Sequence, residues 1–249
     1  VVAEVASRGV VTEHIQVDSQ RPTGRVNVEV GPDGSPTYEI QENVAWDAIQ
    51  YNAATRALAR QVDAVCFGSL AQRSESSRAA IREFLGDAQQ AVRLFDVNLR
   101  QSFYDREVLH ASFQAATIVK LNEEELYIDA DLLFEQDTGN KDEAACLKRL
   151  TDTYQLDLLA LTRGSDGTLL YRDGQRVVGR PVAITRQPDA DSVGAGDACC
   201  AGILYGTLRG WPLEQTVELA NELGAYVASQ AGATPELPGR LLELAASSE

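Results

Sequence analysis

From about residue 45 onward, short apolar runs alternate with segments whose apolar residues recur at helical spacing. Such runs, rich in Val, Ile, Leu and Phe, are typical of buried strands, and their alternation with helices indicates a parallel sheet. We therefore expect an α/β fold, a doubly wound, mostly parallel sheet flanked by helices. The predicted strands are residues 63–67, 92–95, 117–120 and 156–161.

Capping residues and apolar faces mark the expected helices. A first helix ends near Arg8, and another begins near Ser74. The last long helix carries an apolar stripe that includes Leu213 and Val217. The remaining elements are predicted helices at residues 122–134, 142–150 and 213–229 and a hairpin at residues 168–178.

Residues 12–44 have a different pattern. Apolar and polar residues alternate at residues 14–17, 26–30 and 38–40, and residues 31–35 read GPDGS, which is a turn sequence. This pattern predicts an antiparallel hairpin with one apolar face. We expect a small separate sheet at residues 12–44, while residues 1–11 and 45–249 form the α/β core.

The composition excludes several classes of partner. A net charge of −15 and a pI near 4.6 disfavour nucleic acid and anionic membranes, and no apolar run is long enough to span a bilayer. The four cysteines form no Cys-x-x-Cys pair, so we expect reduced thiols and a cytoplasmic protein. Because the sequence holds no Met, we expect that it begins inside a longer chain or lacks methionines of the natural one.

Residues 191–197 read DSVGAGD and lead directly into a small-residue, apolar helix. A helix start presents unpaired backbone N–H groups and the positive end of the helix dipole, and glycine lets an anion approach closely. Asp197 would repel that anion, which makes sense if its carboxylate takes a proton from a hydroxyl that then attacks a phosphoryl group. The alternative is an Asp that the dipole favours in a first turn.

Two better-known phosphate motifs are excluded. A dinucleotide fingerprint needs a third glycine where Cys199 stands, and no Gly-Lys-Ser/Thr sequence of a Walker A loop occurs. Polar residues follow the predicted strands, where ligands bind in doubly wound sheets, so several loops are expected to meet at one crevice. These residues are Gly68, Asp96, Asn98, Arg100, Asn122, Glu125, Thr162 and Gly164.

Taken together, these motifs resemble the ribokinase (PfkB-type) family of sugar kinases. Residues 191–197 match the family's carboxyl-terminal signature, and further landmarks follow in the expected order. They are PTG at residues 22–24, D-x-N-x-R at 96–100, N-x-x-E at 122–125, T-x-G at 162–164, and Asn221 with Gly232. The residues of these motifs are most similar to those of fructokinase-type members, although the family's amino-terminal Gly-Gly segment does not occur in this sequence.

The resemblance implies an ATP-dependent kinase with a catalytic Asp197, whose phosphoryl group is held by the N–H groups of Gly194, Ala195 and Gly196. It implies that Asn122 and Glu125 organise Mg²⁺ through water. Mg²⁺ keeps several waters, so one Glu suffices chemically. Asn-x-x-Glu is also a helix capping box, and both roles can hold together.

The resemblance further implies a nucleotide site, a cation site and sugar contacts. Thr162, Gly164, Asn221 and Gly232 would bind the nucleotide, Asp191 would bind a monovalent cation such as K⁺, and Asn98 and Arg100 would contact the sugar. The alternatives are a solvated helix position for Asn221, a turn-forming role for Asp191, and a surface position for Arg100. Trp46 is expected to pack rather than stack on a sugar.

The function expected from the resemblance is phosphorylation of a hydroxyl, primary by preference, on a small sugar such as fructose or a related hexose or keto sugar acid. Residues 12–44 would form a lid that excludes water, and two lids could pair in a homodimer. Ribose, ketodeoxygluconate and nucleosides stay open as substrates. A nucleoside kinase and a non-catalytic binding protein on the same fold are the alternatives.

Overall fold

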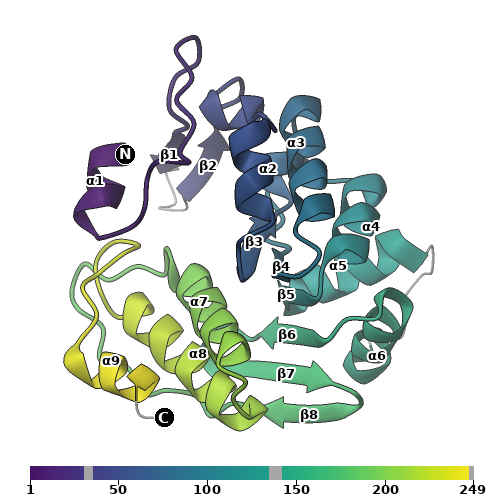
Figure 1. Cartoon of the computed structure of the whole chain (residues 1–249). Helices are drawn as coiled ribbons and strands as arrows, with labels where there is room; N and C mark the ends of the chain where they lie inside the picture. Colours follow the sequence, from purple (N-terminus) through teal and green to yellow (C-terminus); the bar gives the residue numbers. More distant parts are fainter. Residues whose placement is uncertain (31–35, 135–141, 247–249) are drawn as a thin grey trace.

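The computed structural model describes residues 1–30, 36–134 and 142–246, and in this part of the chain six strands form one sheet in the order β3-β4-β5-β6-β7-β8 (Figure 1). The first four pair in parallel, and β7 and β8 continue the sheet antiparallel. The mostly parallel sheet is therefore confirmed. The strands are β3 (Ala64–Gly68), β4 (Val92–Asp96), β5 (Ile118–Asn122), β6 (Leu158–Thr162), β7 (Thr168–Arg172) and β8 (Gln175–Val178).

One face of the sheet is covered by helices that join the strands. On this face Phe95 of β4 meets Phe113 edge to face, with ring centroids 5.7 Å apart, and Leu126 and Leu147 belong to the same buried cluster. Carboxylates cap two of these helices: Asp105 accepts from the Val108 N–H at 2.8 Å. The helices are α3 (Glu75–Asp87), α4 (Arg106–Ala115), α5 (Glu123–Phe134) and α6 (Glu143–Tyr154), of which α6 is capped by Asp142.

The other face is covered by α7 (Ala195–Leu208) and α8 (Leu213–Ala228). Leu94 and Ile118 of the sheet pack there against Ile203 of α7. The two helices lie very close together, because a Cβ atom added to Gly202 would stand 2.6 Å from the Cα atom of Ala220. Small residues in α7 thus let α8 settle against it, and the predicted arrangement of helices on both faces is confirmed.

A second, two-stranded antiparallel sheet is formed by β1 (Val26–Val30) and β2 (Pro36–Ile40), as the alternation predicts. In Figure 1 it stands beside α1 (Val2–Ser7), away from the central sheet. The strand predicted at residues 14–17 does not form, because this segment pairs with no neighbouring strand. The predicted turn at residues 31–35 lies outside the described residues.

Some elements went unpredicted. Besides α4, they are α2 (Ala53–Ala59), capped by Asn52, and α9 (Gly239–Ala246) near the carboxyl end. Short 3-10 turns occur at η1 (Ala45–Ala48), η2 (Leu70–Gln72) and η3 (Gly164–Asp166). No described helix is long and apolar enough to cross a membrane.

A carboxyl group is buried inside the first layer of helices. Asp129 of α5 has no exposed surface, and neither of its carboxyl oxygens has a hydrogen-bond partner among the described residues. Burial, reinforced by the neighbouring charge of Glu125, raises the pKa of Asp129 well above its ordinary value. The folded chain therefore retains the Asp129 proton to higher pH than the unfolded chain, which ionises this group above pH ~4.

This difference in proton binding predicts a pH-dependent effect of Asp129→Asn. Above pH ~4 the folded state binds more protons than the unfolded state, so the stability of the wild type falls as pH rises, until the folded pKa is passed. The variant has no such proton to lose. Its gain in free energy of unfolding should grow between pH 5 and 7, by up to about 1.4 kcal/mol per pH unit.

Urea denaturation at three pH values measures this gain. Glu123→Gln, an exposed change on the same helix, serves as the control and should show no growth with pH. A stability difference for Asp129→Asn that is constant over the range would show that Asp129 is ionised in the folded chain.

Candidate active site

The amino end of α7 lies at the carboxyl ends of the parallel strands. Gly194 caps it with φ +82°, and a Cβ atom there would clash with the backbone of Ala233, so only glycine fits. Ala195 opens the helix, and Asp197 lies in its first turn with an exposed side chain. The Asp197 carboxylate accepts no hydrogen bond from the described residues, and is therefore available to a ligand.

Beneath this helix start lies a buried ion pair. Asp96 of β4 and Lys120 of β5 are register partners, and their side chains meet at 2.8 Å between Nζ and Oδ1. A Cβ atom on Gly196 would stand 3.5 Å from Nζ of Lys120, and the thiol of Cys200 donates to the other oxygen of Asp96 at 3.4 Å. The first turns of α7 therefore rest directly on the pair.

The charge of Lys120 persists despite its burial. Burial by itself lowers the pKa of Lys120, but the facing negative charge, including the Asp96 carboxylate, more than offsets this, so the pKa is raised. A fixed ammonium group thus supplements the helix dipole under the glycines at residues 194–196. Our sequence reasoning missed Lys120. The available signal was a lysine inside the otherwise apolar run of residues 118–121.

Asn122 and Glu125 form the reciprocal bonds of a capping box. Oδ1 of Asn122 accepts from the Glu125 N–H at 2.9 Å, and Oε2 of Glu125 accepts from the Asn122 N–H at 2.9 Å. Oε1 of Glu125 also accepts from the Leu99 N–H at 2.8 Å, so this carboxylate ties β5 to the loop after β4. Burial raises the pKa of Glu125, while these N–H groups and Lys120 oppose the shift.

A cavity of about 300 Å³ lies beside the start of α7. It collects predicted nucleotide-site residues from β6, η3 and α8: Thr162, Gly164 and Asn221. Ala195 and Gly196 line it as well. Asn221 is only 7% exposed and donates to the Arg180 carbonyl at 3.0 Å, so the alternative of a solvated helix position is wrong.

Asp191 and Gly232 are brought together outside that lining. Oδ1 of Asp191 accepts from the Val193 N–H at 2.9 Å, and Oδ2 accepts from the Gly232 N–H at 3.2 Å. The turn-forming role of Asp191 is therefore realised, and the same carboxylate joins the loop before α7 to the segment after α8. The cavity lining does not include Gly232.

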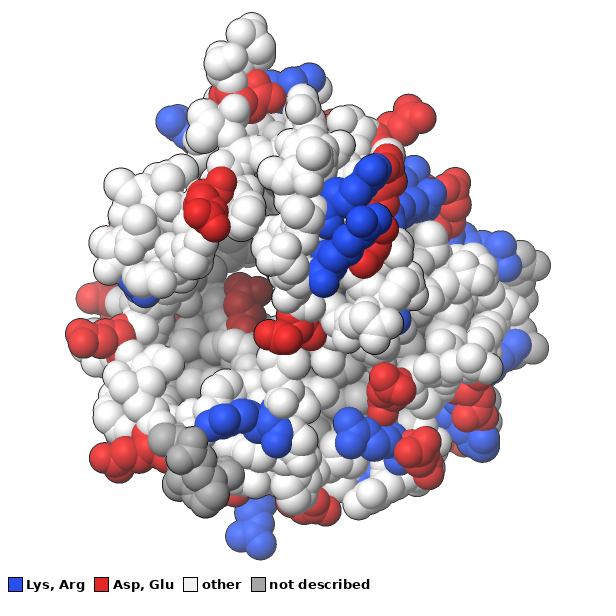
Figure 2. Space-filling model, in the orientation of Figure 1, with Lys and Arg blue, Asp and Glu red and all other residues white. Residues whose placement is uncertain are grey.

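The two predicted sugar contacts follow β4. Asn98 has a positive φ of 43°, and Arg100 is exposed and donates to the Leu99 carbonyl at 3.0 Å. Since Leu99 is also held by Glu125, this loop lies next to the capping box. Figure 2 shows a hollow in the centre of the view, with acidic side chains at its floor and edge.

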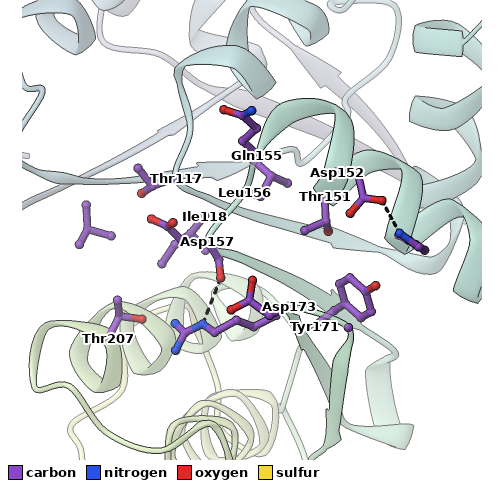
Figure 3. Close-up of a pocket in the computed structure, with 14 residues that line it drawn as sticks. Thr117, Ile118, Thr151, Asp152, Gln155, Leu156, Asp157, Tyr171, Asp173 and Thr207 are labelled. Atoms are coloured by element: carbon purple, nitrogen blue, oxygen red, sulfur yellow. Dashed lines mark hydrogen bonds and ion pairs between the residues drawn. The ribbon is translucent and has the colours of Figure 1, made fainter.

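A larger cavity lies elsewhere. It measures about 890 Å³ and opens at the opposite end of the parallel strands, where Thr117 precedes β5 and Asp157 precedes β6 (Figure 3). It contains none of the predicted site residues. The larger cavity is therefore not the one where the predicted site residues gather, since those residues lie at the carboxyl ends of the strands.

Comparisons with known proteins identify the family of the chain. The model of the pfkB family carbohydrate kinases matches residues 1–240. The fructokinase of Salmonella typhimurium is 28% identical over 240 residues, covering 90% of this chain and 74% of the relative. The fructokinase of Klebsiella pneumoniae is 28% identical over 249 residues, covering 94% of this chain and 76% of the relative.

Solved structures share the fold. The sugar kinase PH1459 of Pyrococcus horikoshii superposes with a TM-score of 0.80 at 25% identity, covering 98% of this chain and 78% of that one. A fructokinase from Xylella fastidiosa with bound ATP gives a TM-score of 0.82 at 21% identity, covering 99% and 80%. The chain therefore belongs to the pfkB family of carbohydrate kinases, a family of sugar kinases that includes fructokinases.

Proposed function

We propose that this chain transfers a phosphoryl group from ATP to a hydroxyl of a small sugar, fructose or a related hexose or keto sugar acid, with Asp197 as the general base. The observation that carries the proposal is the pairing of a free Asp197 carboxylate with the amino end of α7 above the Lys120–Asp96 pair. A base and an anion cradle side by side are what phosphoryl transfer to an alcohol requires.

The chain's own residues divide this work. Asp197 accepts the hydroxyl proton as the oxygen attacks, and the N–H groups at residues 194–196 bind the oxygens of the transferring phosphoryl group. Lys120 adds a fixed positive charge beneath them. Because these groups are held before the substrate arrives, little reorganisation is needed in the transition state.

The nucleotide would occupy the cavity of about 300 Å³ at Thr162, Gly164 and Asn221, with its phosphates toward Gly196. ATP bound to the fructokinase of Xylella fastidiosa supports this choice of donor. Gly232 would border this site through its bond to Asp191. Asn98 and Arg100 would contact the sugar, and the sheet of β1 and β2 would form the lid. Pairing of two lids in a homodimer stays a prediction.

Asn122 and Glu125 fit a Mg²⁺ site in their chemistry, because carboxylate and amide oxygens are the hard donors that the ion prefers. Each Glu125 oxygen accepts one N–H group and keeps a second lone pair for a water molecule. When bound, Mg²⁺ would neutralise phosphate charge. K⁺ binding near Asp191 stays a prediction. Both Asp191 oxygens already accept N–H groups, so an ion would have to share them.

Asp197→Asn is expected to lower kcat by about 10²–10⁴-fold, since the amide cannot accept the proton. Coupled detection of ADP with fructose, ribose, ketodeoxygluconate and adenosine as acceptors measures the loss and names the substrate. Asp189→Asn, an exposed change in the preceding loop, is the matched control and should keep full activity. Equal turnover in Asp197→Asn and wild type would remove Asp197 as the base. ATP binding without turnover on any acceptor would favour a binding protein.

Glu125→Gln is expected to raise the Mg²⁺ concentration for half-maximal activity by about tenfold or more, because the amide loses the charge that orders the ion's waters. A magnesium titration at saturating sugar and ATP measures the change. Glu124→Gln, the exposed neighbour, should titrate as the wild type. An unchanged magnesium requirement would leave Glu125 with its capping role alone.

A further inference from the structure

The base of the β1/β2 sheet is fastened to the core by one guanidinium group. Arg73, at the end of η2, places Nε 2.7 Å from Oδ1 and Nη2 2.8 Å from Oδ2 of Asp47. Its Nη2 also donates to the carbonyl of Gln41, the residue after β2, at 2.6 Å. The Arg73 side chain is 6% exposed, so this two-pronged pair is shielded from water.

The same guanidinium contacts two aromatic rings. Its carbon is 4.4 Å from the centroid of Trp46 and 4.8 Å from the centroid of Phe103. Trp46 also contacts Gly24, which lies so close that any Cβ there would clash with the indole nitrogen. Trp46 therefore packs, as the sequence predicts, and it does so against a charge rather than only against apolar groups.

This stack connects two of the motifs found in the sequence. Gly24 ends the PTG motif of residues 22–24, and the N–H of Phe103 donates to the carbonyl of Arg100, the last residue of D-x-N-x-R, at 3.1 Å. Two backbone hydrogen bonds join the PTG segment to the segment after β2. The Gln41 N–H donates to the Arg25 carbonyl, and the Ala45 N–H donates to the Pro22 carbonyl. The side chain of Arg73 thus contacts Gln41, Trp46 and Phe103 together.

Neighbouring contacts stiffen this arrangement. The Ser77 hydroxyl donates to the Trp46 carbonyl at 2.8 Å, and Oδ2 of Asp47 accepts from the Val44 N–H at 3.1 Å. The Arg73 guanidinium lowers the pKa of Asp47, so the carboxylate is charged at neutral pH. Nη1 of Arg73 is buried and has no acceptor among the described residues, so the group is fixed by its other two nitrogens and by the rings.

We propose that Arg73 is a positioning residue for the acceptor side of the site. It fixes the position of the β1/β2 sheet relative to the loop after Arg100. The sugar would then be bound between two correctly spaced surfaces. This inference rests on the proposed kinase function. Lysine cannot replace arginine here, because a compact ammonium lacks both the planar fork and the stacking surface.

Arg73→Lys tests the proposal. The KM for the sugar should rise about tenfold or more, since small misplacements of a bound reactant are costly, while the KM for ATP stays within about twofold. Arg93→Lys is the matched control: Arg93 is a half-buried arginine whose Nε donates to the Ala115 carbonyl at 2.6 Å, and it lies near the start of β4, whereas D-x-N-x-R begins at the end of that strand. It should lower the melting temperature without changing either KM.

Phe103→Leu keeps the ion pair and removes one ring, which guards against a variant that fails to fold. It should shift the sugar KM in the same direction by a smaller factor. Hydrogen exchange supplies a readout without turnover: in Arg73→Lys, the amides of residues 40–47 and 99–105 should both exchange faster, and in Arg93→Lys neither should. Unchanged sugar KM values with unchanged exchange would overturn the proposal.

The two proposals fail in different ways. A wild type without sugar-dependent turnover refutes the kinase function, and the exchange measurement then still decides whether Arg73 couples the two segments. An active wild type whose sugar KM is the same in Arg73→Lys and Arg93→Lys refutes the positioning role alone.

Discussion

The ion pair between Lys120 and Asp96 is the interaction on which the site depends. Removing two charges from water costs several kcal/mol per ion, and the pair regains this only with close geometry and further hydrogen bonds. Here the ion pair spans 2.8 Å, and Cys200 of α7 supplies an additional bond to Asp96. The pair therefore fixes the height of α7 above the sheet, and with it the position of Asp197. Loss of either partner would leave a buried charge beneath the anion cradle.

Small residues allow α7 to sit that low. Gly194 accepts a left-handed backbone against Ala233, and Gly202 lets α8 approach α7 closely. The amino end of the helix is consequently held by contacts on the sheet side, the α8 side and the loop side. The proposed pairing of a base with several N–H donors would gain from such rigid support, because catalytic groups must be held close to their productive geometry.

The local pattern of apolar residues predicted the strands and helices that bury a regular set of side chains. The apolar runs became strands because a parallel sheet covered on both faces needs them to be continuous. Alternation failed at residues 14–17, since a strand also needs a partner, and no local signal supplies one. Lys120 was missed because its role follows from strand register, which places Asp96 opposite it. Asn221 was undecided because its burial depends on Gly167 and Gly179 closing over it.

The positive features of the site explain how so acidic a chain could hold a polyanionic nucleotide. A net charge of −15 acts through exposed carboxylates, which salt screens over about 8 Å at physiological ionic strength. Lys120 is buried beneath the exposed amino end of α7, so its interactions are weakly screened and stronger than those of a surface charge. For a ligand at Gly194 or Gly196, the electrostatic potential of these nearby groups would therefore matter more than the net charge of the chain.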